Sequence, residues 1–250
     1  MTPAGTVELT VDGWVRPVAG PGTADGAHND RRRLAPPPVR FDPVGLTTGE
    51  DGLERCSWGA TTPDYRAYHD DEWGRPEGDD RRVYEKLCLE GFQAGLSWIT
   101  ILRKRDAFRE AFAAFDPAAV ATFGEADVSR LLADARIVRH RGKIEATIAN
   151  ARATIALQAE GVSLAGLVWS HRPATERVPG QFSELPSATP ESRALSKALR
   201  SRGFSFVGPT TVYSTMQALG IVNDHLEGCH WRAVVGRQRS RFSIPAVNAG

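Results

Sequence analysis

The chain has 250 residues, of which 31 are Lys or Arg and 30 are Asp or Glu, so its net charge is nearly neutral. This length fits one compact domain with tails or two small domains, and 41% apolar residues suffice for a sizeable core. The neutral balance argues mildly against a nucleic-acid-binding protein, although a local basic patch would suffice. No stretch approaches the roughly 18 apolar residues of a membrane span, and no signal peptide is evident. We therefore expect a cytoplasmic protein without membrane association.

The two ends of the chain differ in composition from its middle. Residues 1–52 are rich in Gly, Pro, Asp and Arg, and only a weak alternation over 7–14 is consistent with a strand. Residues 233–250 are first basic and then small and polar. We expect a disordered extension over 1–52, a folded domain over 53–232 and a flexible basic tail over 233–250.

Apolar residues three and four positions apart indicate helices throughout the middle of the chain. Asp116 is suited to cap a helix that has Pro117 at its first position, and Gly203 is suited to end another. The expected helices cover 82–91, 96–104, 106–115, 117–123, 125–135, 143–158, 163–169, 190–202 and 210–220. The pattern predicts an all-α bundle of roughly eight to ten helices without a convincing strand ladder.

Cysteines and histidines form two pairs, one from each end of the expected domain. Cys56 and His69 lie near its start, while His225 and Cys229 are four positions apart and share one face of a helix or tight turn. Together they form the Cys2His2 set that a structural zinc ion prefers. A zinc ion would tie the two ends together in a reducing cytosol, where disulfides are disfavoured.

These residues also have an interpretation without metal, because the spacing is not that of a zinc finger. His225 would then cap a helix, Cys229 would pack in the core and Cys56 would be a free thiol. Cys88 lies between two leucines and is expected to be a buried core thiol. His140 and His230 are alternative members of a metal-binding set.

A turn with glycine at both ends, 203–208, joins two expected helices and is followed by hydroxyl residues. Glycines let backbone N–H groups approach a phosphate closely, as in a helix–hairpin–helix that binds a DNA backbone without reading sequence. A second basic cluster covers 136–143. Ordinary solvated helix ends remain an equal alternative for both. The residues expected to contact DNA here are Gly203, Phe206, Gly208, Thr210, Lys197, Arg141 and Lys143.

Large aromatic residues and one carboxylate gather in the first part of the expected domain. Trp58 and Tyr68 flank Cys56 and His69, and Glu90 and Trp98 follow in a mostly apolar context. Aromatic walls with a carboxylate suit a flat, cationic, hydrogen-bond-donating ring such as an alkylated purine. From these residues alone, packing of the tryptophans in the core and a salt bridge of Glu90 are favoured.

Several motifs, in order, resemble the DNA-3-methyladenine glycosylase I family. They are RCSW (55–58), AYHDDEWG (67–74), EGFQAGLSW (90–98), RHRGK (139–143), GFSFVG (203–208) and VNDH (222–225). The resemblance covers residues 53–232, and the first 50 or so residues match nothing comparable. It implies a helix–hairpin–helix glycosylase bundle in which a structural zinc ion joins the N- and C-terminal parts of the domain.

The resemblance also implies hydrolysis of the N-glycosidic bond of 3-methyladenine in alkylated double-stranded DNA. Glu90 and Tyr68 would be catalytic residues that contact the extruded base, with Trp98 and Trp58 stacking on it. Leu96 would enter the gap left in the duplex. The zinc ligands would be Cys56, His69, His225 and Cys229.

The family resembled lacks the aspartate that many helix–hairpin–helix glycosylases use. Asp224 lies near the place where it would be sought, and we expect it to be structural, as a partner of a zinc ligand. Methylation at N3 makes the base cationic, so that it leaves as a neutral purine without protonation. Contacts that strengthen as the bond breaks then lower the barrier.

Three alternatives remain open at this point. The first is a non-catalytic, zinc-stabilised DNA-binding module, and the second is a glycosylase for another alkylpurine. The third is a helical metalloenzyme with a catalytic zinc, which four protein ligands would disfavour because they leave no open position. We expect a monomer, because no long exposed apolar stripe is evident.

Overall fold

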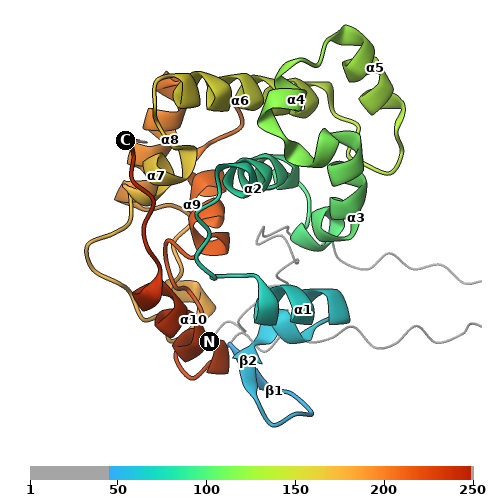
Figure 1. The fold of residues 1–250 in the computed structure, drawn as a ribbon. Helices are drawn as coiled ribbons and strands as arrows, with labels where there is room; N and C mark the ends of the chain where they lie inside the picture. Colours follow the sequence, from blue (N-terminus) through green and yellow to red (C-terminus); the bar gives the residue numbers. More distant parts are fainter. Residues whose placement is uncertain (1–44, 249–250) are drawn as a thin grey trace, which may run out of the picture. The chain divides into compact units, whose positions relative to one another are not determined.

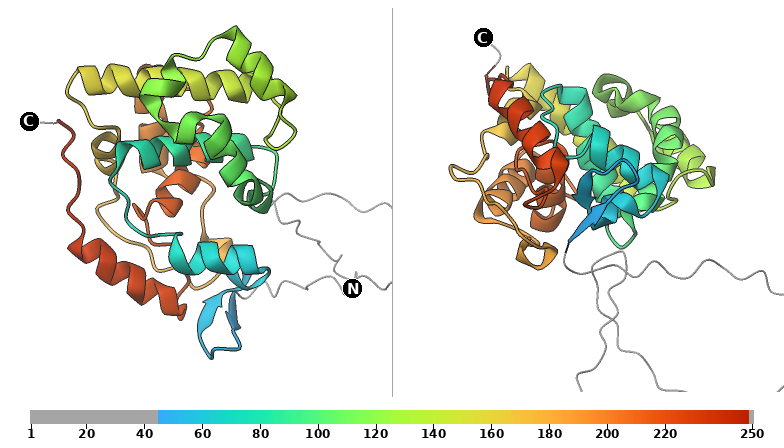
Figure 2. Two further views of the ribbon diagram at one scale, coloured as in Figure 1. Left: turned by 45° about the vertical axis from the view of Figure 1, so that its right-hand side comes forward. Right: turned by 90° about the horizontal axis from the view of Figure 1, so that it is seen from below.

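The computed structural model describes residues 45–248, which form ten α-helices and one small antiparallel sheet (Figures 1 and 2). The sheet pairs β1 (Leu46–Thr48) with β2 (Glu54–Cys56), and Leu46 lies opposite Cys56. The helices are α1 (Pro63–Asp71), α2 (Asp80–Gln93), α3 (Trp98–Ala111), α4 (Pro117–Ala121), α5 (Glu125–Ala133), α6 (Arg141–Ala159), α7 (Leu164–Trp169), α8 (Pro190–Ser201), α9 (Pro209–Ala218) and α10 (His230–Arg241). Short 3-10 turns cover Ser57–Ala60, Ala113–Phe115 and Phe182–Glu184.

The mostly helical fold confirms the predicted class. Helices stand at all the expected places, but the ranges 96–104 and 106–115 are one continuous helix, α3. Neither α1 nor α10 was expected, and β1 lies inside the range assigned to the extension. The possible strand over 7–14 lies outside the described residues. Among residues 45–248, no helix has both the length and the hydropathy needed to cross a bilayer.

Helix α1 begins with a strong local signal although it has no apolar period. Thr62 accepts a hydrogen bond from the backbone N–H of Tyr65 at 3.2 Å, and Pro63 occupies the first helical position. Its buried face carries Tyr65, Tyr68 and His69, so polar and aromatic side chains replace aliphatic ones there. This helix therefore presents functional groups to the interior.

Arginines of α3 pair with carboxylates on α1 and α2. Arg105 forms a double hydrogen bond with Glu72, which follows α1, and Arg109 contacts Glu85 of α2 at 2.7 Å. Because these charges are satisfied across helices, the charged middle of α3 stays helical and the three helices keep a fixed orientation.

Helix α10 and the segment after it pack on the fold, which differs from the expected flexible tail over 233–250. Arg239 is buried and donates to the carbonyls of Gly220 and Ile221 at 2.6 and 2.9 Å. Phe242 then packs on Trp169 with ring centroids 4.8 Å apart. Composition hid this order because one buried arginine, rather than an apolar period, fixes the helix.

A close approach of two glycines joins the end of α9 to the segment after α1. Gly220 has a φ of +70°, and a Cβ atom placed on it would lie 2.4 Å from the backbone oxygen of Gly74. A Cβ on Gly74 would lie 3.2 Å from Nε2 of His225. Only glycine at position 220 permits both the backbone conformation and the contact.

We expect Gly220→Ala to destabilise the protein by at least about 2 kcal/mol, because both the positive φ and the backbone contact oppose a Cβ atom. Gly236→Ala is the matched control, since a Cβ at this helical position meets nothing within 4 Å. The control should change stability by less than about 1 kcal/mol or raise it. Urea unfolding measures the free energy of unfolding of both variants. Equal values for Gly220→Ala and Gly236→Ala would contradict the role of Gly220.

Candidate functional site

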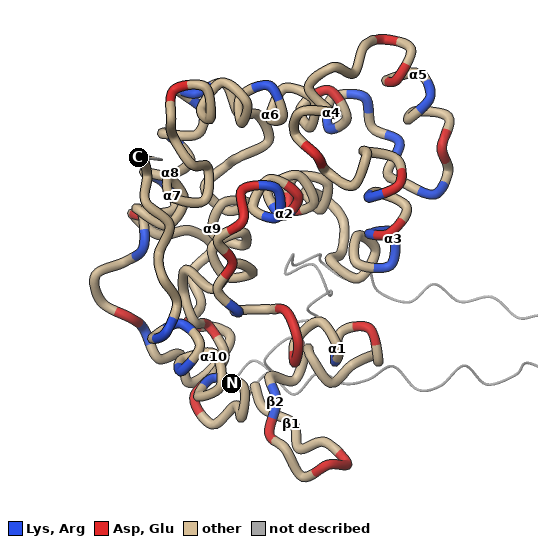
Figure 3. The backbone as a smooth tube through the Cα atoms, viewed as in Figure 1, with Lys and Arg blue, Asp and Glu red and all other residues tan. Residues whose placement is uncertain are grey.

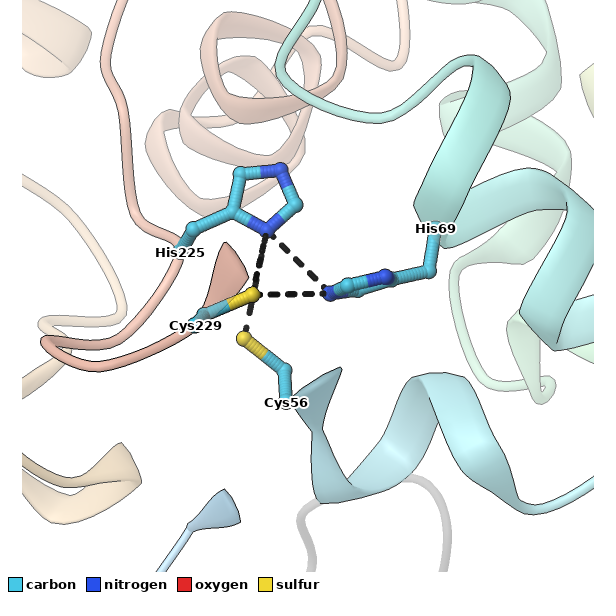
Figure 4. A group of neighbouring side chains, drawn as sticks. All are labelled: Cys56, His69, His225 and Cys229. Atoms are coloured by element: carbon cyan, nitrogen blue, oxygen red, sulfur yellow. Dashed lines mark hydrogen bonds between the residues drawn. The ribbon is translucent and has the colours of Figure 1, made fainter. Parts of the chain in front are cut away.

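Four predicted ligands, Cys56, His69, His225 and Cys229, converge at one buried point (Figure 4). Their donor atoms all lie within 4.8 Å of one another, although two come from the first part of the domain and two from the last. Nδ1 of His225 is 3.1 Å from Nε2 of His69, and Sγ of Cys229 lies 3.6 and 3.7 Å from these nitrogens. Sγ of Cys56 is 4.0 Å from Nδ1 of His225.

The outer nitrogen of each histidine ring has a hydrogen-bond acceptor. Nδ1 of His69 lies 2.8 Å from Oδ1 of Asp70, and Nε2 of His225 lies 3.1 Å from the carbonyl oxygen of Trp73. When each outer nitrogen donates, the inner nitrogen keeps its lone pair for the common point, as in metal-bound histidines. Hydrogen bonding with Cys56, and with both histidines, lowers the pKa of the Cys229 thiol, which favours the thiolate.

The donor geometry fits a tetrahedral ion. Zinc–nitrogen and zinc–sulfur bonds of usual length give edges of about 3.3 Å between two nitrogens and about 3.6 Å between nitrogen and sulfur. The observed separations of 3.1, 3.6 and 3.7 Å lie close to these edges, while the 4.0 Å between Sγ of Cys56 and Nδ1 of His225 is about 0.4 Å longer than the nitrogen–sulfur edge. The four residues are therefore able to hold a metal ion.

The carboxylate that supports this cluster is Asp70 and not Asp224. Asp70 receives Nε of Arg55 at 2.9 and 3.0 Å in addition to its contact with His69. Asp224 instead accepts hydrogen bonds from Tyr213 and Gln217. The partners of Asp224 are therefore in α9 and not among the predicted ligands, so the expected pairing of Asp224 with a zinc ligand is not found.

Aromatic rings connect the Cys/His cluster to the predicted base-binding residues. The ring of Trp58 lies 5.1 Å from that of His69 and 6.3 Å from that of Tyr68. The rings of Tyr68 and Trp98 lie 5.3 Å apart at 45°. The structure thus brings Trp58, Tyr68 and Trp98 together, with Tyr68 held by the helix that also carries His69.

Glu90 is a buried acid near these rings, with 5% exposure. Burial raises its pKa to about 7, while the neighbouring Lys86 opposes this rise. Among residues 45–248, no group donates a hydrogen bond to this carboxylate, which acts electrostatically on Tyr68, and Nε1 of Trp98 is a buried donor without an acceptor. Buried polar groups are rarely left unpaired, so these two are suited to receive a ligand.

Lys86, which was not among the residues predicted from the sequence, also belongs to this site. Its Nζ donates to Oη of Tyr68 at 3.3 Å and lies over the rings of Tyr68 and Trp98, 4.9 and 4.8 Å from their centroids. The signal for it was its spacing of four from Glu90, which places both on one face of α2. We call Glu90, Lys86, Tyr68 and Trp98 the base cluster.

The glycine-bounded turn between α8 and α9 is held by side chains from other elements. Asn150 of α6 donates to the carbonyl of Ser205 at 3.1 Å and accepts from its N–H at 2.7 Å, and Ser196 donates to the carbonyl of Val207 at 2.6 Å. Phe206 has a φ of 56° and a partly exposed ring that contacts His140. The turn therefore meets the second basic cluster.

The predicted DNA-contact residues differ in how accessible they are. Gly203, Thr210, Lys197 and Arg141 are exposed, and Gly208, which precedes α9, is half-buried. Arg141 pairs with Glu125 and Glu145, so part of its charge is neutralised. Figure 3 shows basic and acidic positions interspersed around α3 to α6, in keeping with the neutral net charge.

Lys143 is buried and its ammonium is used within the fold. Nζ donates to the carbonyls of Phe92 and Ala94 at 2.8 and 2.6 Å, at the end of α2. This fixes the turn before α3, where Gly95 has a φ of +81° and Leu96 is half-buried. Lys143 therefore supports the segment that carries Leu96 rather than facing solvent.

The family match covers the whole base cluster and three of the four Cys/His residues, and it begins two residues after Cys56. Residues 58–233 match the family model of methyladenine glycosylases. The chain belongs to the methyladenine glycosylase family. It is 53% identical over 180 residues to DNA-3-methyladenine glycosylase 1 of Escherichia coli, which covers 71% of this chain and 96% of that protein. It is 46% identical over 178 residues to the DNA-3-methyladenine glycosylase of Haemophilus influenzae, with coverages of 70% and 96%.

Solved structures of methyladenine glycosylases have the same fold as this chain. A crystal structure of 3-methyladenine DNA glycosylase I aligns with a TM-score of 0.69 and 52% identity, covering 70% of this chain and 98% of that one. A Staphylococcus aureus structure, described as the structural basis of 3-methyladenine recognition, aligns with a TM-score of 0.67 and 36% identity and covers 71% and 96%. Residues before 58 and after 233 lie outside the family match.

We expect Glu90→Gln to be more stable than the wild type near neutral pH. Folding raises the pKa of Glu90 from 4.5 to about 7, so the folded protein keeps a proton that the unfolded chain releases in this window. The contribution of Glu90 to wild-type stability should therefore fall by about 2 to 3 kcal/mol as the pH rises through this window, and the variant should lack this contribution.

Urea unfolding at about pH 5 and about pH 8 measures the difference between the two proteins. A Gln variant that is less stable at both pH values would show that Glu90 is a structural ion-pair partner instead.

Proposed function

We propose that this chain is a base-excision repair glycosylase that hydrolyses the N-glycosidic bond of 3-methyladenine in alkylated double-stranded DNA. The observation that carries the proposal is the buried carboxylate of Glu90, which receives no hydrogen bond from residues 45–248 and acts electrostatically on Tyr68, whose ring packs on that of Trp98. The two relatives support the proposal, because both are DNA-3-methyladenine glycosylases and this chain matches almost their whole length. The reaction releases the free base and leaves an abasic site.

Glu90 and the two rings would recognise the charge and shape of the lesion. Methylation at N3 places a positive charge on the purine, which a carboxylate in a poorly solvated site attracts strongly. The flat cation stacks on aromatic faces, and its amino group donates to the carboxylate. Normal adenine lacks the charge, so it gains less from the same contacts.

The charge also makes the reaction possible without an acid. The alkylated base leaves as a neutral purine when the bond to the sugar breaks, and water completes the hydrolysis at the sugar carbon. Tyr68 supports this site as a neutral phenol, because burial holds its pKa well above the usual value. Glu90 acts on the base by electrostatic and hydrogen-bond contacts that favour the transition state.

The turn 203–208 and the start of α9 would bind the DNA backbone. Backbone N–H groups at a helix start attract phosphate, and Lys197 lies exposed before the turn. Lys143 fixes the segment that carries Leu96 beside the base cluster, so Leu96 would enter the duplex where the nucleotide leaves it. We assign Trp58 a supporting place behind Tyr68.

We propose that Cys56, His69, His225 and Cys229 hold a structural zinc ion. The support is their convergence, the outward hydrogen bonds of both histidines and the fit to tetrahedral edges. Zinc would link the two ends of the domain and would supply no reacting group, because four protein ligands fill its coordination sphere. This argues against a catalytic metal.

The first test measures release of free base from DNA treated with a methylating agent. The wild type should release 3-methyladenine, and Glu90→Gln should do so at least about tenfold more slowly, a loss of about 1.4 kcal/mol of transition-state stabilisation. Glu110→Gln is the matched control, because its side chain is 65% exposed on α3. DNA binding by the wild type without base release would favour a non-catalytic module.

The second test removes one proposed metal ligand. The wild type should contain about one zinc ion per chain by elemental analysis, and Cys229→Ser should lose the ion together with at least about 2 kcal/mol of stability. Cys88→Ser replaces a buried cysteine outside the cluster and should keep the metal. If wild-type protein prepared with zinc holds none, the four side chains are only a hydrogen-bonded cluster.

A further inference from the structure

The base cluster already contains a cation before any purine binds. Nζ of Lys86 lies 4.9 and 4.8 Å from the ring centroids of Tyr68 and Trp98, over both rings. This is the position from which a ring attracts a cation through its negative face. An alkylated purine that stacks on the same rings brings a second positive charge to the same place.

The charges that act on Lys86 lie on α2 itself, on α3 and just after α1. Glu72 follows α1 and is paired with Arg105 of α3, while Glu85 and Glu90 lie on α2 with Lys86 itself. Burial lowers the pKa of Lys86, and the carboxylates, with Glu90 first, act in the opposite direction. The ammonium therefore partly neutralises the field that Glu90 would exert on a ligand.

Lys86 also faces a second place to which its ammonium can move. A cavity of about 250 Å³ is lined by Lys86 together with Glu72, Glu85 and Arg105. Its walls carry four acidic residues and four arginines, and three of the acids are already paired with arginines. The lysine stem is flexible enough to change rotamer. An ammonium that moves from the rings into this cavity therefore still has acidic side chains near it.

We propose that Lys86 is a specificity-determining residue of the base cluster, whose ammonium occupies the cation–π position over Tyr68 and Trp98 and is displaced when a cationic purine stacks there. The proposal rests on the proposed function of this cluster. Lys86 lowers the affinity for cationic purines while leaving that for neutral purines nearly unchanged. The site consequently discriminates less by charge than Glu90 alone would allow, and neutral damaged purines compete better for it.

The test compares the binding of two small purines to the wild type and Lys86→Met. One probe is 3,9-dimethyladeninium, a cation that mimics the alkylated nucleoside, and the other is 3-methyladenine, which is uncharged slightly above neutral pH. Methionine keeps the unbranched shape of the lysine stem and removes the charge. Quenching of tryptophan fluorescence reports binding, since Trp98 lies in the cluster.

We expect Lys86→Met to bind the cation about tenfold more tightly, because a nearby like charge is removed, and to bind the neutral purine within about twofold of the wild type. Loss of Lys86 also changes the protonation of Glu90. The comparison is therefore repeated with Glu90→Gln present in both proteins, where the selective gain for the cation should persist. Lys104→Met, which removes a lysine bonded to the carbonyls of Ala135 and Arg136, should change neither affinity.

An equal change for both probes would overturn the proposal, because it would show a steric effect of the lysine stem. Weaker binding of the cation by Lys86→Met would overturn it as well, since the ammonium would then support the ligand. If neither probe binds to any of the proteins, the assignment of the base cluster itself fails. Unchanged thermal unfolding of Lys86→Met confirms that the compared proteins are folded.

Discussion

The structure depends on the convergence of side chains from the two ends of the domain on one buried point. Residues 56 and 229 are separated by most of the folded chain, yet their sulfur atoms belong to one group of donors within 4.8 Å. His69 lies on α1 directly after Tyr68, so whatever fixes His69 also fixes the phenol of the base cluster. Asp70 extends this constraint through Arg55 to β2. The Cys/His cluster thus helps to position the base cluster, although the two clusters share no residue.

The base cluster shows how stability is exchanged for recognition. Within residues 45–248, Glu90 is buried without a hydrogen-bond donor and Nε1 of Trp98 is buried without an acceptor. Burying either polar group without a hydrogen-bond partner lowers the stability of the folded protein, and an apolar side chain at either position would avoid this cost. Lys86 reduces the cost of burying Glu90 by its opposite charge, but it reduces the attraction for a cation by the same means. The charge of Lys86 therefore raises the stability of the folded protein and, on our proposal, lowers its affinity for a cationic purine.

Much of the architecture could be predicted from periodicity and from helix-capping residues, as Pro117 and Asp116 of α4 illustrate. Helix α1 was missed because its buried face is aromatic and polar, although Thr62 and Pro63 mark its start. Helix α10 was missed because a buried arginine holds it.

The four candidate metal ligands could be named from the sequence, while their convergence could not, because spacing does not fix how distant segments meet. The burial of Lys143 was equally hidden, since its carbonyl partners lie about fifty positions earlier in the chain.

Asn150 has a consequence for the energetics of DNA association. Its side-chain amide forms hydrogen bonds with both the N–H and the carbonyl of Ser205, as a neighbouring backbone segment would do. The turn is therefore already ordered in the free protein. A flexible turn would lose conformational entropy on contact with a phosphate, and that loss would weaken binding. If the turn binds the DNA backbone as we propose, its existing order avoids most of this loss, and the favourable energy of that contact is available for extruding the nucleotide.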